Sequence, residues 1–174
     1  MKARPLLVII RGPIGAGKTT LMRALARDHR LRFWVLDTDA ANSHHPPDPS
    51  GEFLDQEWNL EIEVLALHAR LVLGRGLNLV MDPGLLLTTK KVDRFLRKTG
   101  RRRSDPRVVL FRLTASAREA VRRKSTLPPA YVRASHRGWV TRPVRGELLI
   151  ETDGRTPEQV AAIARKLLRG RISA

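Results

Sequence analysis

Cysteine is absent from this chain of 174 residues. Its absence excludes a disulfide framework, a thiolate nucleophile and cysteine metal ligands. Aromatic residues are scarce, at 5% of the chain, and do not interleave with the basic clusters, which weakens the case for a stacking platform for single-stranded nucleic acid. No apolar run approaches the ~20 residues of a membrane span. The apolar stretch near the N-terminus is too short for a signal peptide. Together these absences predict a cytoplasmic protein.

Acidic residues are also few, with 17 Asp and Glu against 33 Lys and Arg, and the formal net charge is +16. Three interpretations stay open at this point. The charge could neutralise the phosphates of a nucleic acid, it could surround a site for small anionic substrates, or it could be arginine-rich composition without a function. Net charge concerns association rather than fold.

A phosphate-loop pattern, G-x-x-x-x-G-K-[ST], is matched at every fixed position from Gly12 to Thr19. An apolar run at residues 6–10 precedes it and a helical segment at 21–27 follows, and a strand, a glycine turn and a helix N-terminus together make an anion site. Lys18 would place a charge at the β and γ phosphates, and Thr19 would give a hydroxyl to Mg²⁺. The expected nucleotide contacts are Gly12, Pro13, Ile14, Gly15, Ala16, Gly17, Lys18, Thr19 and Thr20. The chain is therefore predicted to bind a nucleoside triphosphate with Mg²⁺.

Apolar, β-branched runs alternate with helical patterns along the chain, which is typical of βαβ units and a parallel sheet. The expected strands are residues 6–10, 32–36, 77–81, 108–113 and 147–151. We find no internal repeat and no second-domain boundary. The sequence predicts one α/β domain of the P-loop NTPase fold over residues 1–174, with a five-stranded parallel sheet flanked by helices. In such sheets ligands bind at the carboxyl ends of the strands.

Three aspartates follow expected strands at that edge. Asp82 closes an apolar strand, which is a Walker B arrangement in which the acid holds Mg²⁺. The alternative is an aspartate that caps the turn at residues 83–84. Asp37 and Asp39 lie two apart, so their side chains share a direction in extended chain, and the alternative is a pair of turn-forming aspartates. We expect both in the acceptor pocket, with Asp39 as the base that takes the acceptor proton and Asp37 helping to organise magnesium.

Arginines concentrate between the fourth and fifth expected strands, where small kinases place a mobile lid that closes over the triphosphate. We expect this lid at about residues 122–145. The planar fork of a guanidinium grips phosphate oxygens, and Arg123 and Arg133 are the predicted catalytic pair. Most other members are expected to be solvated. The cluster comprises Arg118, Arg122, Arg123, Lys124, Arg133, Arg137, Arg142 and Arg145.

A second basic cluster lies in the segment 90–103 and is either a solvated helix face or a docking surface for nucleic acid. On the long helix expected at residues 52–73, Glu61 and Glu63 occupy the more polar side. Either could reach into the acceptor pocket, and the alternative is a solvated face. Glu63 is the predicted substrate contact.

These motifs resemble the small P-loop kinases, most closely the branch with the zeta toxins, the chloramphenicol-phosphotransferase-like proteins and the polynucleotide-kinase-like domains. Zeta toxins have an aspartate-x-aspartate after the second strand, followed by a histidine-proline loop, here Asp37-x-Asp39 and His45-Pro46. They also have an Asn-Leu-Val strand that ends in an acid, here residues 78–82.

The resemblance implies an ATP-dependent kinase with Lys18 on the phosphates, Thr19 on Mg²⁺, Asp39 as base and lid arginines as electrophilic stabilisers. The expected acceptor is a hydroxyl of a small molecule such as a nucleoside, nucleotide, sugar or antibiotic. Two alternatives stay open: a polynucleotide 5′-hydroxyl kinase, and a switch that binds and hydrolyses a nucleotide without an acceptor. A GTPase switch needs an Asn/Thr-Lys-x-Asp motif, and residues 89–92 do not match it, which favours ATP over GTP.

Overall fold

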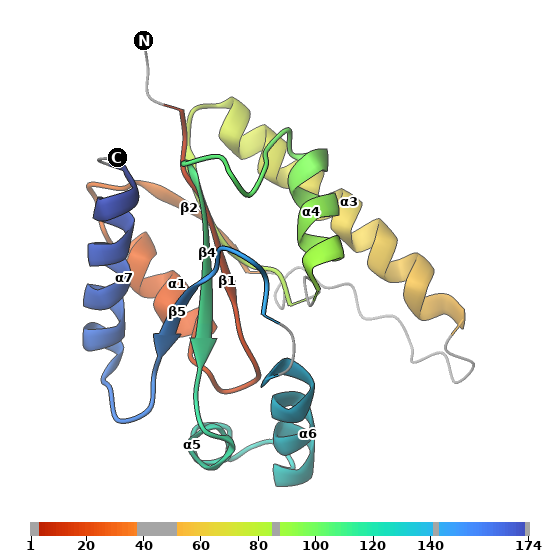
Figure 1. The fold of residues 1–174 in the computed structure, drawn as a ribbon, viewed down its shortest axis with the longest axis vertical. Helices are drawn as coiled ribbons and strands as arrows, with labels where there is room; N and C mark the ends of the chain where they lie inside the picture. Colours follow the sequence, from red (N-terminus) through yellow and green to blue (C-terminus); the bar gives the residue numbers. More distant parts are fainter. Residues whose placement is uncertain (1–3, 38–51, 85–87, 141–142, 173–174) are drawn as a thin grey trace.

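The computed structural model describes residues 4–37, 52–84, 88–140 and 143–172 (Figure 1). A parallel sheet lies at its centre, with strands in the order β2-β3-β1-β4-β5. The prediction of a five-stranded parallel sheet is therefore confirmed. The strands are β1 (Leu7–Arg11), β2 (Phe33–Asp37), β3 (Asn78–Asp82), β4 (Val108–Thr114) and β5 (Leu148–Glu151).

Helices cover both faces of the sheet (Figure 1). One face packs against α1 (Lys18–Ala26) and α7 (Pro157–Ile172), and the other against α3 (Glu52–Gly74) and α4 (Thr89–Lys98). Alternate residues of β1 enter the two apolar clusters, with Val8 and Ile10 in one and Leu7 and Ile9 in the other. A strand buried on both faces needs a continuous apolar run, which is what the sequence has there.

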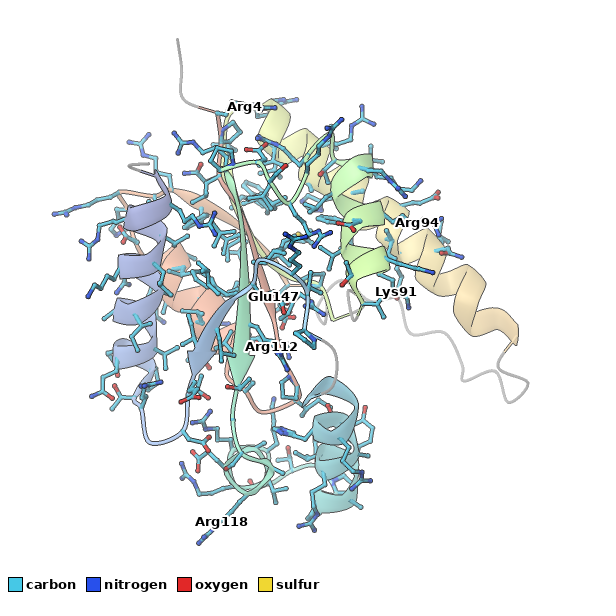
Figure 2. All side chains as sticks on the ribbon, in the orientation of Figure 1. Arg4, Lys91, Arg94, Arg112, Arg118 and Glu147 are labelled. Carbon is cyan, nitrogen blue, oxygen red and sulfur yellow. The ribbon has the colours of Figure 1, made fainter. Side chains whose placement is uncertain are left out.

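Two further helices, α5 (Ala117–Arg123) and α6 (Pro129–Val140), lie beyond the carboxyl ends of β4 and β5 (Figure 1). The α5 helix begins at the N-cap residue Ser116, whose Oγ accepts from the Glu119 N–H at 3.2 Å. Figure 2 shows Arg118 projecting outward from this helix. Within the described ranges no helix is long and apolar enough to cross a membrane.

The strand boundaries differ from the sequence expectation in one informative way. Strands β1, β2 and β3 each begin and end one residue later than predicted. Asp37 and Asp82 are therefore the last residues of their strands rather than the first residues of the following loops. A residue inside a ladder has its position fixed by backbone hydrogen bonds, so the two carboxylates are placed by the sheet itself.

Candidate active site

The loop between β1 and α1 follows a path that requires glycine at two positions. Gly12 has φ +152°, and a Cβ there would lie 2.5 Å from the carbonyl oxygen of Leu113 in β4. Gly15 has φ +78°, and its Cβ would lie 2.9 Å from the Cα of Ala120 in α5. L-residues with a Cβ rarely adopt these conformations. The loop is held closely between β4 and α5 because both positions lack side chains.

The beginning of α1 is suited to an anion. Gly17 is its N-cap residue, no side chain caps it in the described structure, and its first turn contains no acid. The first N–H groups of a helix have no partner within the helix, and the helix dipole adds partial positive charge there. Lys18, Thr19 and Thr20 therefore present backbone donors at the end of the glycine loop, which is the arrangement that binds phosphate groups.

Lys18 and Asp82 meet at the mouth of this loop. The Lys18 Nζ lies 3.8 Å from Asp82 Oδ2 and donates to the carbonyl oxygen of Pro13 at 3.4 Å. The Lys18 side chain is 17% exposed and that of Asp82 is 5% exposed. The ammonium group therefore lies beside the loop, with a buried carboxylate holding it toward the end of β3.

Asp37 lies directly opposite Asp82 in the β2–β3 ladder. Its Oδ1 atom is buried and has no hydrogen-bond partner among the described residues. Burying a carboxylate oxygen without a donor is unfavourable, and a bound cation would supply the missing counter-charge. The two carboxylates and the Thr19 hydroxyl are oxygen ligands of the kind Mg²⁺ prefers, and Mg²⁺ is typically held by one or two carboxylates together with substrate phosphates. The residues present therefore fit Mg²⁺.

A metal site built from protein groups alone is not found in the described ranges, which contain no cluster of three or more His, Cys, Asp or Glu side chains that could hold an ion. The two strand-end carboxylates would leave most positions of an octahedral ion to phosphate oxygens and water. The arrangement is consistent with a cation that arrives with a nucleotide.

A cavity of about 270 Å³ opens beside the phosphate loop, between α1, α5 and the connection from β5 to α7. Its lining combines apolar side chains with arginines. Flat aromatic groups stack favourably on both kinds of surface. The cavity is lined by Ala16, Gly17, Thr20, Leu21, Glu119, Arg122, Arg123, Thr152, Arg155, Pro157 and Val160.

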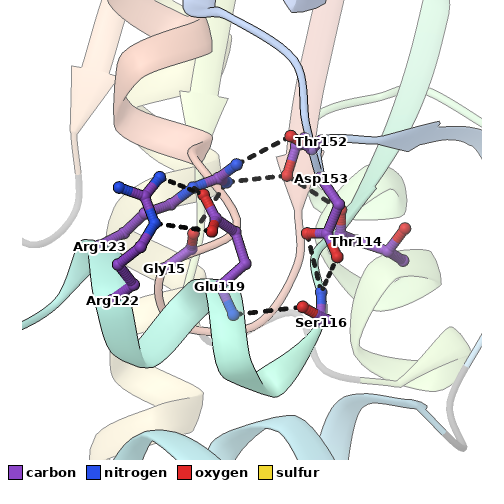
Figure 3. Close-up of polar contacts among 8 residues, drawn as sticks. All are labelled: Gly15, Thr114, Ser116, Glu119, Arg122, Arg123, Thr152 and Asp153. Carbon is purple, nitrogen blue, oxygen red and sulfur yellow. Dashed lines mark hydrogen bonds and ion pairs between the residues drawn. The ribbon is translucent and has the colours of Figure 1, made fainter.

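Arg123 joins three parts of the site (Figure 3). Its Nε donates to Glu119 Oε1 at 2.8 Å, its Nη2 to the Thr152 carbonyl oxygen at 2.8 Å, and its Nη1 to the Gly15 carbonyl oxygen at 3.3 Å. The sequence placed Arg123 on the transferring phosphoryl group. In this structure its guanidinium connects α5, the end of β5 and the phosphate loop.

Glu119 is the acceptor that organises this arginine pair. Hydrogen bonds from Arg122, and then from Arg123, lower the pKa of Glu119 from 4.5 to about 2. The Arg122 Nη2 donates to Glu119 Oε1 at 2.6 Å. Glu119 is not among the site residues predicted from the sequence, although a glutamate three and four residues before two arginines has the spacing of paired side chains on a helix.

Helix α6 is seated on the phosphate loop through two adjacent residues that the sequence did not single out. Ser135 Oγ accepts from the Ile14 N–H at 3.3 Å, and His136 Nε2 lies 3.0 Å from the Ile14 carbonyl oxygen. A carbonyl oxygen only accepts, so Nε2 carries the proton and donates. His136 is buried. No sequence motif marks these contacts, which join residues more than 100 positions apart.

Three further predicted site residues are Asp39, Arg133 and Glu63. Asp39 is outside the described residues. Arg133 is exposed on α6. Glu63 accepts from Lys98 Nζ at 2.9 Å, so it turns toward α4, and this hydrogen bond is the main reason that its pKa is lowered. The described part of the expected lid contains the last two residues of α5 and all of α6, and of its arginines Arg123 contacts the phosphate loop at Gly15.

The second basic cluster is paired to a large extent with acids of its own neighbourhood. Such pairing favours the interpretation as a solvated helix face. The pairs are Arg94 and Lys98 with Glu63, Arg101 with Asp105, and Arg103 with Asp93.

A parallel sheet of this strand order, with a glycine loop and lysine between β1 and α1 and an acid at the end of β3, defines a P-loop nucleotide-binding protein. The chain belongs to the AAA domain family AAA_33, whose model matches residues 7–174. No curated protein matches the sequence significantly.

Two solved structures show the same fold. A sugar kinase from Janibacter sp. HTCC2649 is 21% identical, with a TM-score of 0.68 over 95% of each chain. A gluconokinase from Sinorhizobium meliloti 1021 is 15% identical, with a TM-score of 0.66 over 98% of this chain and 93% of the other. With the family match, these likenesses confirm the resemblance to small P-loop kinases.

Proposed function

We propose that this protein is an ATP-dependent kinase that transfers the γ-phosphoryl group to a hydroxyl of a small molecule. The observation that carries the proposal is the ion pair between Lys18 and Asp82 at the mouth of the phosphate loop. Asp37 is the neighbour of Asp82 on the adjacent strand. A phosphate cradle alone supports nucleotide binding. Phosphoryl transfer also needs a bound cation, and the carboxylates of Asp37 and Asp82 beside Lys18 are suited to bind one.

In the proposed reaction the acceptor hydroxyl oxygen attacks the γ-phosphorus, the bond to the β–γ bridging oxygen breaks, and ADP leaves. The hydroxyl proton passes to a carboxylate, for which Asp39 is the proposed base. The loop N–H groups and Lys18 would hold the phosphates in place, while Thr19 and Asp82 would hold Mg²⁺. When bound, Mg²⁺ would neutralise charge that develops on the phosphate oxygens. Positioning and charge stabilisation supply most of the rate in such reactions.

For the nucleoside part of ATP, we propose the cavity beside the loop as the binding site. We propose that the base lies between the apolar side chains of Pro157 and Val160 and the guanidinium groups of Arg122 and Arg155, all of which line that cavity. An arginine over the base adds a stacking contact. Arg123, held by Glu119 and Thr152, keeps α5 against the loop.

For the acceptor, a polyhydroxylated sugar or sugar acid is the first class to test, because the two similar structures are named as a sugar kinase and a gluconokinase. Nucleosides, nucleotides and antibiotics are the further small-molecule classes. A polynucleotide acceptor receives less support, because much of the second basic cluster is neutralised by nearby acids.

The test is a label-transfer screen with γ-labelled ATP and Mg²⁺ against pools of sugars and sugar acids, nucleosides and nucleotides, antibiotics, and a 5′-hydroxyl oligonucleotide. Transfer to a small molecule supports the proposal. Transfer to the oligonucleotide alone, falling steeply with salt, would establish the polynucleotide kinase instead. Label released only as inorganic phosphate would indicate a hydrolysing switch.

Two variants test the residue roles once an acceptor is known. Lys18→Ala should lose turnover and weaken ATP binding, whereas Lys166→Ala, a lysine exposed on α7, should behave as the parent protein. Asp39→Asn should lower kcat by about 10²–10⁴-fold while ATP affinity changes little, as expected for loss of a base. Normal turnover of Asp39→Asn would refute the base assignment without refuting the kinase.

A further inference from the structure

The long helix α3 is apolar on two opposite sides. Its inner side packs in the core through Ile62, Leu65, Ala66, Ala69, Val72 and Leu73. Its outer side carries Leu60, Val64, Leu67 and Leu71, which are 62%, 58%, 57% and 60% exposed. We call these four residues the outer stripe. An ordinary surface helix is polar on the side away from the core, so this pattern is unusual.

The spacing within the outer stripe is four, three and four residues, which is the a/d pattern of a coiled-coil seam. At about 100° per residue, the four side chains fall within one narrow arc along the helix. Single exposed apolar residues are common on soluble proteins, whereas a contiguous row of large ones marks an interaction surface. The outer stripe is therefore shaped to receive another helix.

The charge distribution along α3 indicates which partner helix, in which orientation, would pack on the outer stripe. Residues 52–63 contain five acids and no base, whereas residues 64–75 contain Arg70, Arg75 and His68 and no acid. In a parallel pair of such helices, acids would face acids. In an antiparallel pair, the acidic half of each helix faces the basic half of the other, and the helix dipoles also oppose one another favourably.

An antiparallel pair of α3 helices is also consistent in register. A twofold axis between Val64 and Leu67 sets Leu60 of one copy against Leu71 of the other, and Val64 against Leu67. The surface thus complements itself, as the isologous interface of a symmetric dimer must.

We propose that the outer stripe of α3 is a homodimer interface, in which two copies of this chain pack α3 against α3 in antiparallel orientation. The interface lies on the outside of the fold, and none of its residues contributes to the phosphate loop or to the carboxylates at the ends of β2 and β3. The proposal is independent of the activity of the protein.

The first test measures molar mass by sedimentation or light scattering from about 1 to about 100 µM protein, a range in which a specific dimer changes population. We expect twice the mass of the chain at the upper end. Leu67→Lys should raise the dimer dissociation constant about tenfold or more, because each copy would then place a lysine ammonium group at the centre of the apolar interface. Circular dichroism verifies that this exposed substitution leaves the fold intact.

Leu149→Lys is the matched control, since Leu149 is 55% exposed on β5 and lies outside the outer stripe. This variant should dimerise as the parent protein does. A parent protein that stays monomeric over the whole range would overturn the proposal. An equal effect of both substitutions would also overturn it.

The orientation has its own test, because the natural chain contains no cysteine. We expect Leu60→Cys protein mixed with Leu71→Cys protein to form a disulfide-linked pair under a mild oxidant, while neither variant forms one alone. Linkage of each variant to itself would show parallel helices and would refute the antiparallel arrangement. Absence of any linkage in the mixture would refute the interface.

Discussion

At the scale of single residues, Arg11 shows how the sheet supports the loop that follows it. It is the last residue of β1, its side chain is fully buried, and it forms an ion pair with Glu147. Burial, together with the nearby charge of Arg112, lowers the pKa of Arg11 to about 10. The second Glu147 oxygen accepts from the Val144 N–H at 2.7 Å. The pair thus connects the segment before β5 to the strand that leads into the phosphate loop.

Glu147→Gln tests this connection. The amide keeps the shape of the side chain but removes the counter-charge of a buried guanidinium, and breaking a buried pair from one side costs about 3–5 kcal/mol. We expect the free energy of unfolding, measured by denaturant titration, to fall by about 3 kcal/mol. Glu151→Gln, at an exposed position, is the control and should change it by less than about 0.5 kcal/mol. Equal effects would mean that the buried charge is not the cause.

Glu119 gives a prediction about pH. Its pKa is lowered from 4.5 to about 2 by hydrogen bonds from Arg122 and Arg123. A carboxylate with a depressed folded-state pKa contributes stability above its unfolded pKa and loses it as the pH falls through the folded value. The parent protein should therefore lose stability between about pH 4.5 and 2 more steeply than Glu119→Gln. Denaturant unfolding at a series of pH values measures the difference, and parallel curves would contradict the assignment.

At the scale of elements, the contact between α6 and the phosphate loop couples two segments that are far apart in the chain. Ser135 and His136 hold both backbone groups of Ile14. Helix α5 approaches the same loop at Gly15, where a side chain would collide with Ala120. The loop is therefore shaped from outside by two helices as well as from within by its glycines.

His136→Ala removes one of these two anchors, and the Ile14 carbonyl oxygen loses its donor. We expect amide hydrogens of α6, Pro129–Val140, to exchange faster while those of β1 and β4 keep their protection, since opening would be local. Hydrogen exchange read by mass spectrometry provides the measurement. The control is His29→Ala, an exposed histidine away from α6. Unchanged exchange in α6 would show that the contact does not hold the helix.

At the scale of the whole molecule, nucleotide binding should raise the free energy of unfolding of the protein. A ligand that binds only the folded state at about 100 times its dissociation constant adds about 2.7 kcal/mol. For a chain of this size that corresponds to a rise in Tm of about 5–10 °C. We expect this shift with ATP and Mg²⁺ in a thermal melt and a much smaller one for Lys18→Ala. An equal shift in the variant would place nucleotide binding elsewhere.

The amino-acid sequence by itself determined the phosphate loop, the number of strands and their parallel arrangement. These features are local: the G-K-T pattern is contiguous, and each apolar run forms its own strand. The sequence also predicted that Asp37 and Asp82 lie at one edge of the sheet, because the carboxyl ends of parallel strands share an edge.

Only the tertiary structure decided which side chains meet there. The ladder sets Asp37 opposite Asp82, packing brings Lys18 to Asp82, and α6 reaches Ile14 across 121 positions of the chain. Arg123, expected on the phosphoryl group, is held by Glu119 and Thr152. Contacts of this kind depend on the packing of elements distant in sequence, where short-range patterns carry no information about which partner each side chain finds.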